Sequence, residues 1–155
     1  MAILLGRLLT DALMIVISSA LVVLVAVLMG VTIATGIPGI ILLLVTAAFF
    51  GLTWSGIFLA IGMRTRSAET LSSFGSGVAF ILLFVSSGMF PTSIMPSWAQ
   101  TVSNWNPVSY VSNALRSTII GGYDWRAFAS AYIMTTVLAV IAFAAALYQF
   151  RKTTS

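Results

Sequence analysis

The sequence has 155 residues, of which 60% are hydrophobic and only 6% are charged, with a formal net charge of +4. A soluble globular domain uses far more charged surface than this, so the composition predicts a membrane protein, and the scattered basic residues give no reason to expect nucleic acid as a partner. Cysteine and histidine are absent, which excludes disulfides, thiol chemistry and a metal site built on the usual transition-metal ligands.

Four stretches reach the roughly 20 apolar residues that a membrane-spanning helix requires. They cover about residues 8–31, 39–62, 71–90 and 127–149. The first follows Arg7 and has no convincing small-residue cleavage site, so we expect a retained helix and not a secretory signal. The sequence therefore predicts an all-α membrane protein with four transmembrane helices in a single domain, and the short connection 32–38 makes the first two helices antiparallel neighbours.

The arginines and the single lysine predict the orientation of the chain. If every helix crosses, five basic residues fall on one side, and only Arg116 and Arg126 fall on the other; the five are Arg7, Arg64, Arg66, Arg151 and Lys152. Cytoplasmic loops carry the excess of positive charge. We therefore expect a multi-pass protein of the cell membrane with both termini in the cytoplasm.

A different kind of segment, residues 91–122, separates the third apolar stretch from the fourth. It contains Pro91, Pro96 and Pro107, so it cannot be one continuous helix. A first short helix is expected from Pro96, with Trp98, Val102 and Trp105 on one face. A second should begin at Pro107, with Asn106 as its N-cap, and stop at Gly121-Gly122. Both are too short to span, so the pair must lie along the membrane face or re-enter it.

The second short helix is predicted to be two-sided. One side carries the apolar residues Val108, Val111, Leu115 and Ile119, and the other carries Ser109, Ser112, Asn113 and Arg116. A lone arginine costs about 2.5–3.5 kcal/mol at the centre of a spanning helix, so Arg116 must lie shallow or be paired. Asp124 is the nearest acid in sequence and could pair with Arg116 or with Arg126. Arg116 could anchor the helix at the headgroups, or act in gating or substrate contact.

Small residues mark the expected helix contacts, because helices in lipid pack where their backbones can approach closely. The strips are Ala47, Gly51 and Ser55 on the second helix, Ser73 and Gly77 on the third, and Ala131, Thr135 and Ala139 on the fourth. We interpret them as internal packing and not as a substrate path or dimer face. Asp11 is interpreted as the i,i+4 partner of Arg7 and not as a proton-relay residue.

The sequence contains no recognisable catalytic or nucleotide-binding site. A phosphate-binding loop ends in Gly-Lys-Ser/Thr, whereas the only lysine, Lys152, follows Arg151 near the end of the sequence. No histidine is present to activate a serine, and the acids Asp11, Glu69 and Asp124 fall on both sides of the predicted membrane. We therefore expect no enzyme active site and no cofactor in this chain.

An ordered series of motifs in the segment between the last two spans resembles a known family. It comprises Phe90-Pro91, Met95-Pro96-Ser97-Trp98, Asn106-Pro107-Val108-Ser109-Tyr110, Asn113-Ala114-Leu115-Arg116 and Gly121-Gly122. The series is similar to the outer re-entrant region of type-2 ATP-binding-cassette (ABC) exporter permeases, including the daunorubicin-resistance and multidrug exporters. The resemblance makes this segment the candidate gate. It also implies a separate ABC ATPase subunit that binds ATP, a second permease subunit in a homo- or heterodimer, and a small hydrophobic substrate.

The resemblance also implies which part of the family pattern is present. Gly6-Arg7 resembles the start of the family's third helix, so the four predicted spans correspond to its third to sixth helices. The expectation is the C-terminal part of a longer or split permease, with the coupling segment that docks on the ATPase outside this sequence. The alternative is a non-transporting membrane scaffold or a degenerate permease remnant. A proton- or ion-coupled carrier is disfavoured, because the predicted helix interiors hold almost no charge.

Overall fold

The structure, a computed structural model, describes residues 2–65, 68–90 and 92–153. This part of the chain contains no strand, which confirms an all-α protein. The helices are α1 (Ala2–Leu28), α2 (Gly36–Thr65), α3 (Ala68–Phe84), the 3₁₀ turn η1 (Thr92–Ile94), α4 (Ser97–Trp105), α5 (Pro107–Arg116), the π-helix η2 (Ser117–Gly121) and α6 (Trp125–Thr153).

Three helices of the described chain are long and apolar enough to cross a membrane. Their apolar spans are Leu9–Leu28 in α1, Gly36–Phe58 in α2 and Trp125–Ala144 in α6. The third predicted span is shorter than expected, because α3 has 17 residues. At about 1.5 Å per residue, α3 is about 25 Å long, less than the roughly 30 Å of a hydrocarbon core. The predicted count of four spans is therefore not confirmed.

A distant side chain and a local one bond the last carbonyls of α3, which ends at Phe84 instead of continuing to residue 90. The Asn106 side-chain amide donates a hydrogen bond to the Leu82 carbonyl at 2.6 Å, and the Ser86 hydroxyl donates to the Leu83 carbonyl at 2.6 Å. These carbonyls lie in the last turn of α3, where a helix leaves its C=O groups without partners of its own. The chain then turns through residues 85–90.

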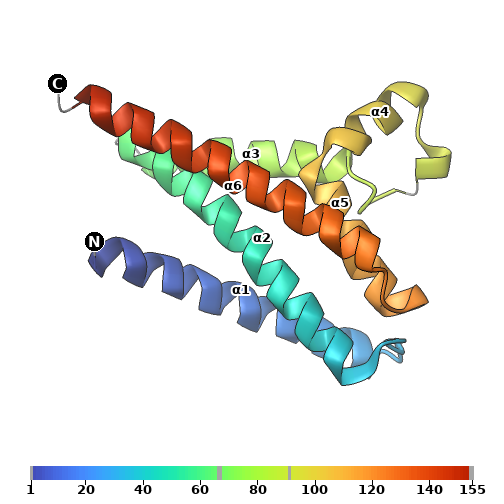
Figure 1. Cartoon of the computed structure of the whole chain (residues 1–155). Coiled ribbons are helices and arrows are strands. Elements are labelled where there is room, and N and C mark those ends of the chain that lie inside the picture. Colours follow the sequence, from blue (N-terminus) through green and yellow to red (C-terminus); the bar gives the residue numbers. More distant parts are fainter. Residues whose placement is uncertain (1, 66–67, 91, 154–155) are drawn as a thin grey trace.

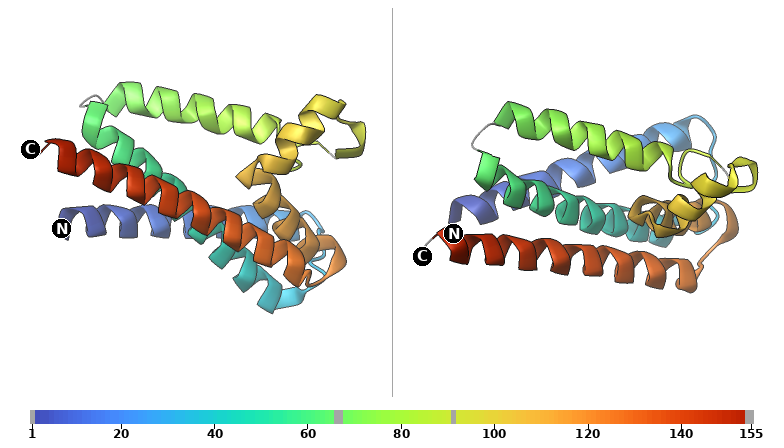
Figure 2. Two further views of the ribbon diagram at one scale, coloured as in Figure 1. Left: turned by 45° about the horizontal axis from the view of Figure 1, so that its top comes forward. Right: turned by 90° about the horizontal axis from the view of Figure 1, so that it is seen from above.

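The helices α1, α2, α3 and α6 run lengthwise through an elongated bundle, and the short helices α4 and α5 lie at one end of it (Figure 1). α2 lies at its centre and packs against α1 and α6, while α5 packs against α6 and α2. The two views in Figure 2 place both termini, the end of α2 and the start of α3 at one end of the bundle, and the α1–α2 connection and the α4–α5 region at the other. The direction of the chain thus alternates as the sequence predicts.

The basic residues that the sequence predicts on the cytoplasmic side belong to the end of the bundle that carries the termini, where the structure describes them. The backbones of Arg7, Arg64, Arg151 and Lys152 belong to the helical segments at the end that carries the termini. Arg66 lies outside the described residues. Arg116 and Arg126 belong to the opposite end, at the end of α5 and the start of α6.

The buried core lies where α5 and α6 meet. Val111 and Ala114 from α5 pack against Phe128 and Ala131 from α6, with Leu42 and Phe50 of α2 beside them. The α1 span, by contrast, has no buried residue, and its leucines and valines are largely exposed. Such a surface would be unfavourable in water but suits a hydrocarbon environment, so the distribution of apolar side chains agrees with a membrane location.

Residues 92–121 form what we call the helical insert. As predicted, it is broken into two short helices at Asn106. Pro96 precedes α4 as its N-cap and is not its first helical residue. α5 is followed by the five-residue π-helix η2, which ends the insert, and the next residue is Gly122, whose φ of +95° a residue with a side chain rarely adopts.

Candidate functional site: the polar contacts of the helical insert

Asn106 connects the helical insert to the end of α3. Its side-chain Oδ1 accepts a hydrogen bond from the Val108 backbone N–H at 3.0 Å, which confirms the predicted N-cap of α5. Pro107 occupies the next position, where a missing N–H costs nothing. The other half of the same amide donates to the Leu82 carbonyl. One side chain, only 3% exposed, therefore caps the start of α5 and the end of α3 together.

Three buried serines continue this connection. The Ser87 backbone N–H donates to Ser109 Oγ at 3.1 Å, and Ser109 Oγ shares a hydrogen bond with Ser103 Oγ at 2.9 Å. The Ser87 hydroxyl lies 2.9 Å from Asn113 Oδ1, to which it donates. No buried side-chain polar atom lacks a partner in the part of the chain that is described. A buried network that is fully satisfied favours one fixed arrangement, here of α3 against α4 and α5.

Arg116 adds a charged contact at the edge of this network. Its Nη2 donates to the Ser87 carbonyl at 2.8 Å, while the side chain as a whole remains exposed. Asp124 instead accepts hydrogen bonds through Oδ1 from the backbone N–H groups of Arg126 and Ala127, at 3.0 and 3.2 Å. Asp124 thus caps α6, and among the described residues it forms no ion pair with Arg116.

Aromatic residues cover the outward face of α4. Trp98 and Trp105 are 65% and 77% exposed, and Val102 lies on the same exposed face, whereas Ala99 and Ser103 are buried on the other. The Tyr110 hydroxyl donates to the Asn104 carbonyl at 2.7 Å and so connects α5 back to α4. Amphipathic aromatic rings suit the headgroup level of a bilayer. The helix therefore has the side chains of an interfacial element.

The remaining motif residues lie at the ends of the insert. Phe90 is exposed just before it, and Pro91 lies outside the described residues. Gly121 closes η2 and Gly122 follows in the left-handed region. No contact of these residues indicates a ligand, and their part in a gate stays a prediction.

The small residues predicted on α2 face α1. A Cβ added to Gly51 would lie 2.5 Å from Ile15 Cδ1, so the two helices approach more closely than a side chain at Gly51 would allow. The Ser55 hydroxyl donates to the Asp11 carboxylate on α1, and Ala47 is half-buried. The expected partner of Asp11 was Arg7, whose side chain is outside the described part of the structure. Asp11 thus has a partner on another helix that the sequence did not suggest.

The strips of small residues predicted on α3 and α6 differ in burial. Ala131 and Thr135 of α6 are buried and Ala139 is half-buried, as internal packing requires. Ser73 and Gly77 of α3 are instead exposed, and nothing in the described chain lies within 4 Å of a Cβ added to Gly77. The residue of α3 that allows close approach is Gly75, where an added Cβ would lie 2.8 Å from Phe58 Cε1 of α2.

Sequence reasoning missed Ser86 and Ser87, because both were included in the third apolar span. A signal was available, since Ser86-Ser87-Gly88 combines residue types that favour turns at the end of an apolar run. Sequence reasoning also missed two hydrogen bonds between the α1–α2 connection and η2. Thr35 Oγ1 donates to the Thr118 carbonyl at 2.8 Å, and the Ala34 backbone N–H donates to the Ile119 carbonyl at 3.0 Å. Sequence offers no signal for contacts between segments so far apart.

Comparison with known proteins agrees with this architecture. The family model described as ABC-2 type transporter matches residues 1–120. The daunorubicin resistance ABC transporter permease protein DrrB1 of Streptomyces coeruleorubidus is 32% identical over 116 residues, which cover 75% of this chain and 41% of that protein. The match thus spans less than half of the relative's length, and no solved structure matches the chain significantly. This chain is a multi-pass membrane protein that belongs to the ABC-2 type transporter family.

Proposed function

We propose that this chain is the membrane-spanning permease subunit, or part of one, of an ATP-driven exporter that moves an apolar or amphipathic compound out of the cell. Membership of the ABC-2 type transporter family carries this proposal. The similarity to a daunorubicin resistance permease supports export of a drug-like compound. The energy would come from an ATPase partner, which membership of the ABC-2 type transporter family implies.

The orientation that we propose places the termini in the cytoplasm and the helical insert at the outer face. The excess of basic residues at the end of the bundle that carries the termini supports it. The aromatic face of α4, with Trp98 and Trp105 exposed, would then lie at the outer headgroups. A second permease subunit would complete the transport path.

The polar network would transmit movement between the spans and the insert. The Asn106 amide bonds to Leu82 in α3, and Ser87 in the turn after α3 bonds to Asn113 and Arg116 of α5. Hydrogen bonds are directional, so the end of α3 and this turn cannot shift against α5 without breaking several of them together. Movement of α3 during an ATP-driven cycle would therefore move the insert as a unit, which is the behaviour expected of a gate.

Transport in inside-out membrane vesicles tests the proposal. The tagged chain would be purified in mild detergent to identify the ATPase subunit that accompanies it, and both would be expressed together. Daunorubicin, the compound in the relative's name, is fluorescent and can serve as the first test compound. We expect ATP-dependent accumulation that requires both polypeptides and stops with a non-hydrolysable ATP analogue. Co-purification of other membrane proteins without an ATPase, together with no uptake, would favour the scaffold alternative.

A further inference from the structure

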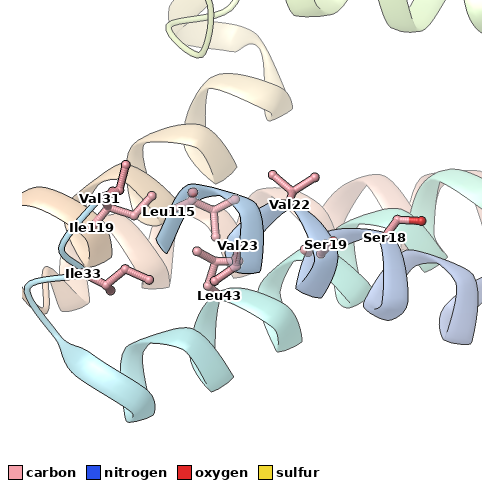
Figure 3. Close-up of a pocket in the computed structure, with 11 residues that line it drawn as sticks. Ser18, Ser19, Val22, Val23, Val31, Ile33, Leu43, Leu115 and Ile119 are labelled. Carbon is pink, nitrogen blue, oxygen red and sulfur yellow. The ribbon is translucent and has the colours of Figure 1, made fainter. Parts of the chain in front are cut away.

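An apolar cavity lies between α1, α2 and the helical insert. It has a volume of about 390 Å³, within the range of about 300–1,000 Å³ typical of small-molecule sites. Val23 of α1, Leu43 of α2 and Leu115 of α5 surround it (Figure 3). Val22 also lines the cavity and is 69% exposed, on a helix whose apolar span has no buried residue. The cavity therefore opens on the side of α1 that faces the hydrocarbon of a membrane.

The lining of the cavity suits hydrocarbon better than water or a charged group. The described residues that line it include no charged one, and only Ser18 and Ser19 carry hydroxyls. Ser18 is exposed, and its oxygen points away from the other labelled lining residues (Figure 3). A charged group that entered would lose its hydration without gaining an ionic partner. Water needs several polar partners to occupy a cavity, and this lining does not offer them.

Contacts on both sides of the cavity hold α1 at a distance from α5. Towards the termini, α1 approaches α2 closely at Gly51, where an added Cβ would lie 2.5 Å from Ile15 Cδ1. At the other end, the connection that follows α1 bonds to η2 through the Thr35 hydroxyl and the Ala34 backbone N–H. α1 therefore cannot move onto α5 and close the cavity without disturbing these contacts. Left empty, the cavity would deprive its lining of van der Waals contacts.

We propose that an acyl chain of a bilayer lipid occupies this cavity and packs between α1 and the helical insert. Acyl chains surround the exposed side of α1 in a membrane, and they are flexible enough to follow an irregular apolar lining. The headgroup remains outside, because no charged residue of the described lining could bind it. The site thus recognises the chain and not the headgroup. The proposal goes beyond transport, because the lipid is a structural part of the protein in the absence of ATP and substrate.

A helix of another subunit is the competing occupant, but it is too large for the cavity. A helix about 10 Å in diameter that spans about 30 Å takes up roughly 2,400 Å³. The cavity has a volume of about 390 Å³, so such a helix could cover its mouth but could not enter it. A single flexible chain fits the available space better.

Nuclear Overhauser contacts between protein methyl groups and lipid chains test the proposal in phosphatidylcholine nanodiscs. Leu43 and Val111 are almost equally buried, with 7% and 6% exposure, but only Leu43 lines the cavity. Leu24 is 55% exposed on α1 and lies outside the lining. With methyl-protonated, otherwise deuterated protein, we expect contacts to chain methylenes from Leu24 and Leu43 but none from Val111. All of these contacts should vanish when the lipid chains are deuterated, which identifies the chain as their source.

Three results would overturn the proposal. Contacts at Leu24 without contacts at Leu43 would mean that lipid surrounds the bundle but does not enter the cavity. Contacts at Leu43 that persist with chain-deuterated lipid would mean that protein fills it. Equal contacts at Leu43 and Val111 would mean that the signal at Leu43 is not particular to the cavity.

Filling the cavity from within is the second measurement. Ala47 and Ala26 both line it, so Ala47→Leu should remove the contacts of Leu43 with the chain and leave those of Leu24 unchanged. Ala26→Leu makes the same test from α1 should Ala47→Leu fail to fold. Contacts at Leu43 that survive in both variants would show that the chain reaches this residue by another route, and would refute the site.

Exchange of the headgroup tests what is recognised. Phosphatidylglycerol with the same acyl chains adds a negative charge but leaves the chain unchanged. We expect the contacts of Leu43 to keep their intensity relative to those of Leu24. A several-fold loss or gain at Leu43 alone would show that the headgroup decides binding, which contradicts a site that recognises only the chain.

Discussion

Replacing Asn106 would test whether one amide holds the helical insert on α3. Its two hydrogen bonds can be separated by choice of substituent, because serine is also a good N-cap but is too short to reach the Leu82 carbonyl. Asn106→Ser should therefore lose only the bond to α3, which is 2.6 Å long. Asn106→Ala should lose that bond and the 3.0 Å cap of α5 as well.

The expected magnitudes follow from the burial of these groups. Leaving a carbonyl without its donor costs about 1–3 kcal/mol when it is buried, and the Leu82 carbonyl is partly buried; Asn106→Ser should therefore weaken docking of the insert by about 2 kcal/mol at most, or up to about thirtyfold in the opening equilibrium. Loss of the N-cap adds about 1 kcal/mol, which brings Asn106→Ala to about a hundredfold.

Hydrogen exchange in bilayer nanodiscs measures this equilibrium segment by segment. Amides of α4 and α5 should exchange faster in the order parent, Asn106→Ser, Asn106→Ala, while amides in the middle of α6 keep their protection. Equal exchange in all three proteins would refute the bridging role of Asn106. A uniform increase that includes α6 would show that the insert is not a separate unit.

Three further pairs of variants test other contacts. Arg116→Ala should reduce efflux without preventing assembly of the complex, because it loses the bond to the Ser87 carbonyl. The control Arg126→Ala makes the same change of charge and should transport normally. Equal efflux from both variants would show that Arg116 is only a membrane anchor. Pro107→Ala should increase proteolysis within the insert more than Pro38→Ala does at the start of α2, because Pro107 fixes the break between α4 and α5; equal cleavage would contradict this. Gly39→Ala should lower thermal stability, because its Cβ would lie 1.6 Å from a threonine hydroxyl oxygen that is bonded to η2. Gly56→Ala meets nothing within 4 Å in the described chain and should stabilise α2 by up to about 1 kcal/mol; the opposite order of melting temperatures would refute the packing argument.

Composition and hydrophobic periodicity were sufficient to predict the helices and their alternating direction. The proline and asparagine signals were specific enough to predict the break at Asn106 and the start of α5 at Pro107. The length of α3 was not predictable in the same way. Ser86-Ser87-Gly88 gave a local turn signal inside the apolar run, but the bond from the Asn106 side chain, more than 20 residues later, to the Leu82 carbonyl was not visible in the sequence. The end of this helix therefore combines a local signal with a tertiary contact.

The partners of the charged residues were less predictable than the helices. Proximity in sequence suggested Asp124 for Arg116, but Asp124 satisfies the first N–H groups of α6, and the guanidinium binds a backbone carbonyl in the turn after α3. Asp11 likewise bonds to Ser55 of α2, which is 44 residues away. Sequence spacing indicates which side chains share one helix, whereas these partners depend on how the helices pack.

The π-helix η2 has a consequence for how related sequences should be compared. A π-turn holds one more residue than an α-turn, and here its carbonyls at Thr118 and Ile119 accept hydrogen bonds from the α1–α2 connection. A relative with one residue fewer between Arg116 and Gly122 should continue as a regular α-helix in nearly the same register, because the wider π-turn absorbs its additional residue, but without the π-turn that presents these two carbonyls. Single-residue gaps at this position in an alignment would therefore separate transporters that fasten this loop from transporters in which it is loose.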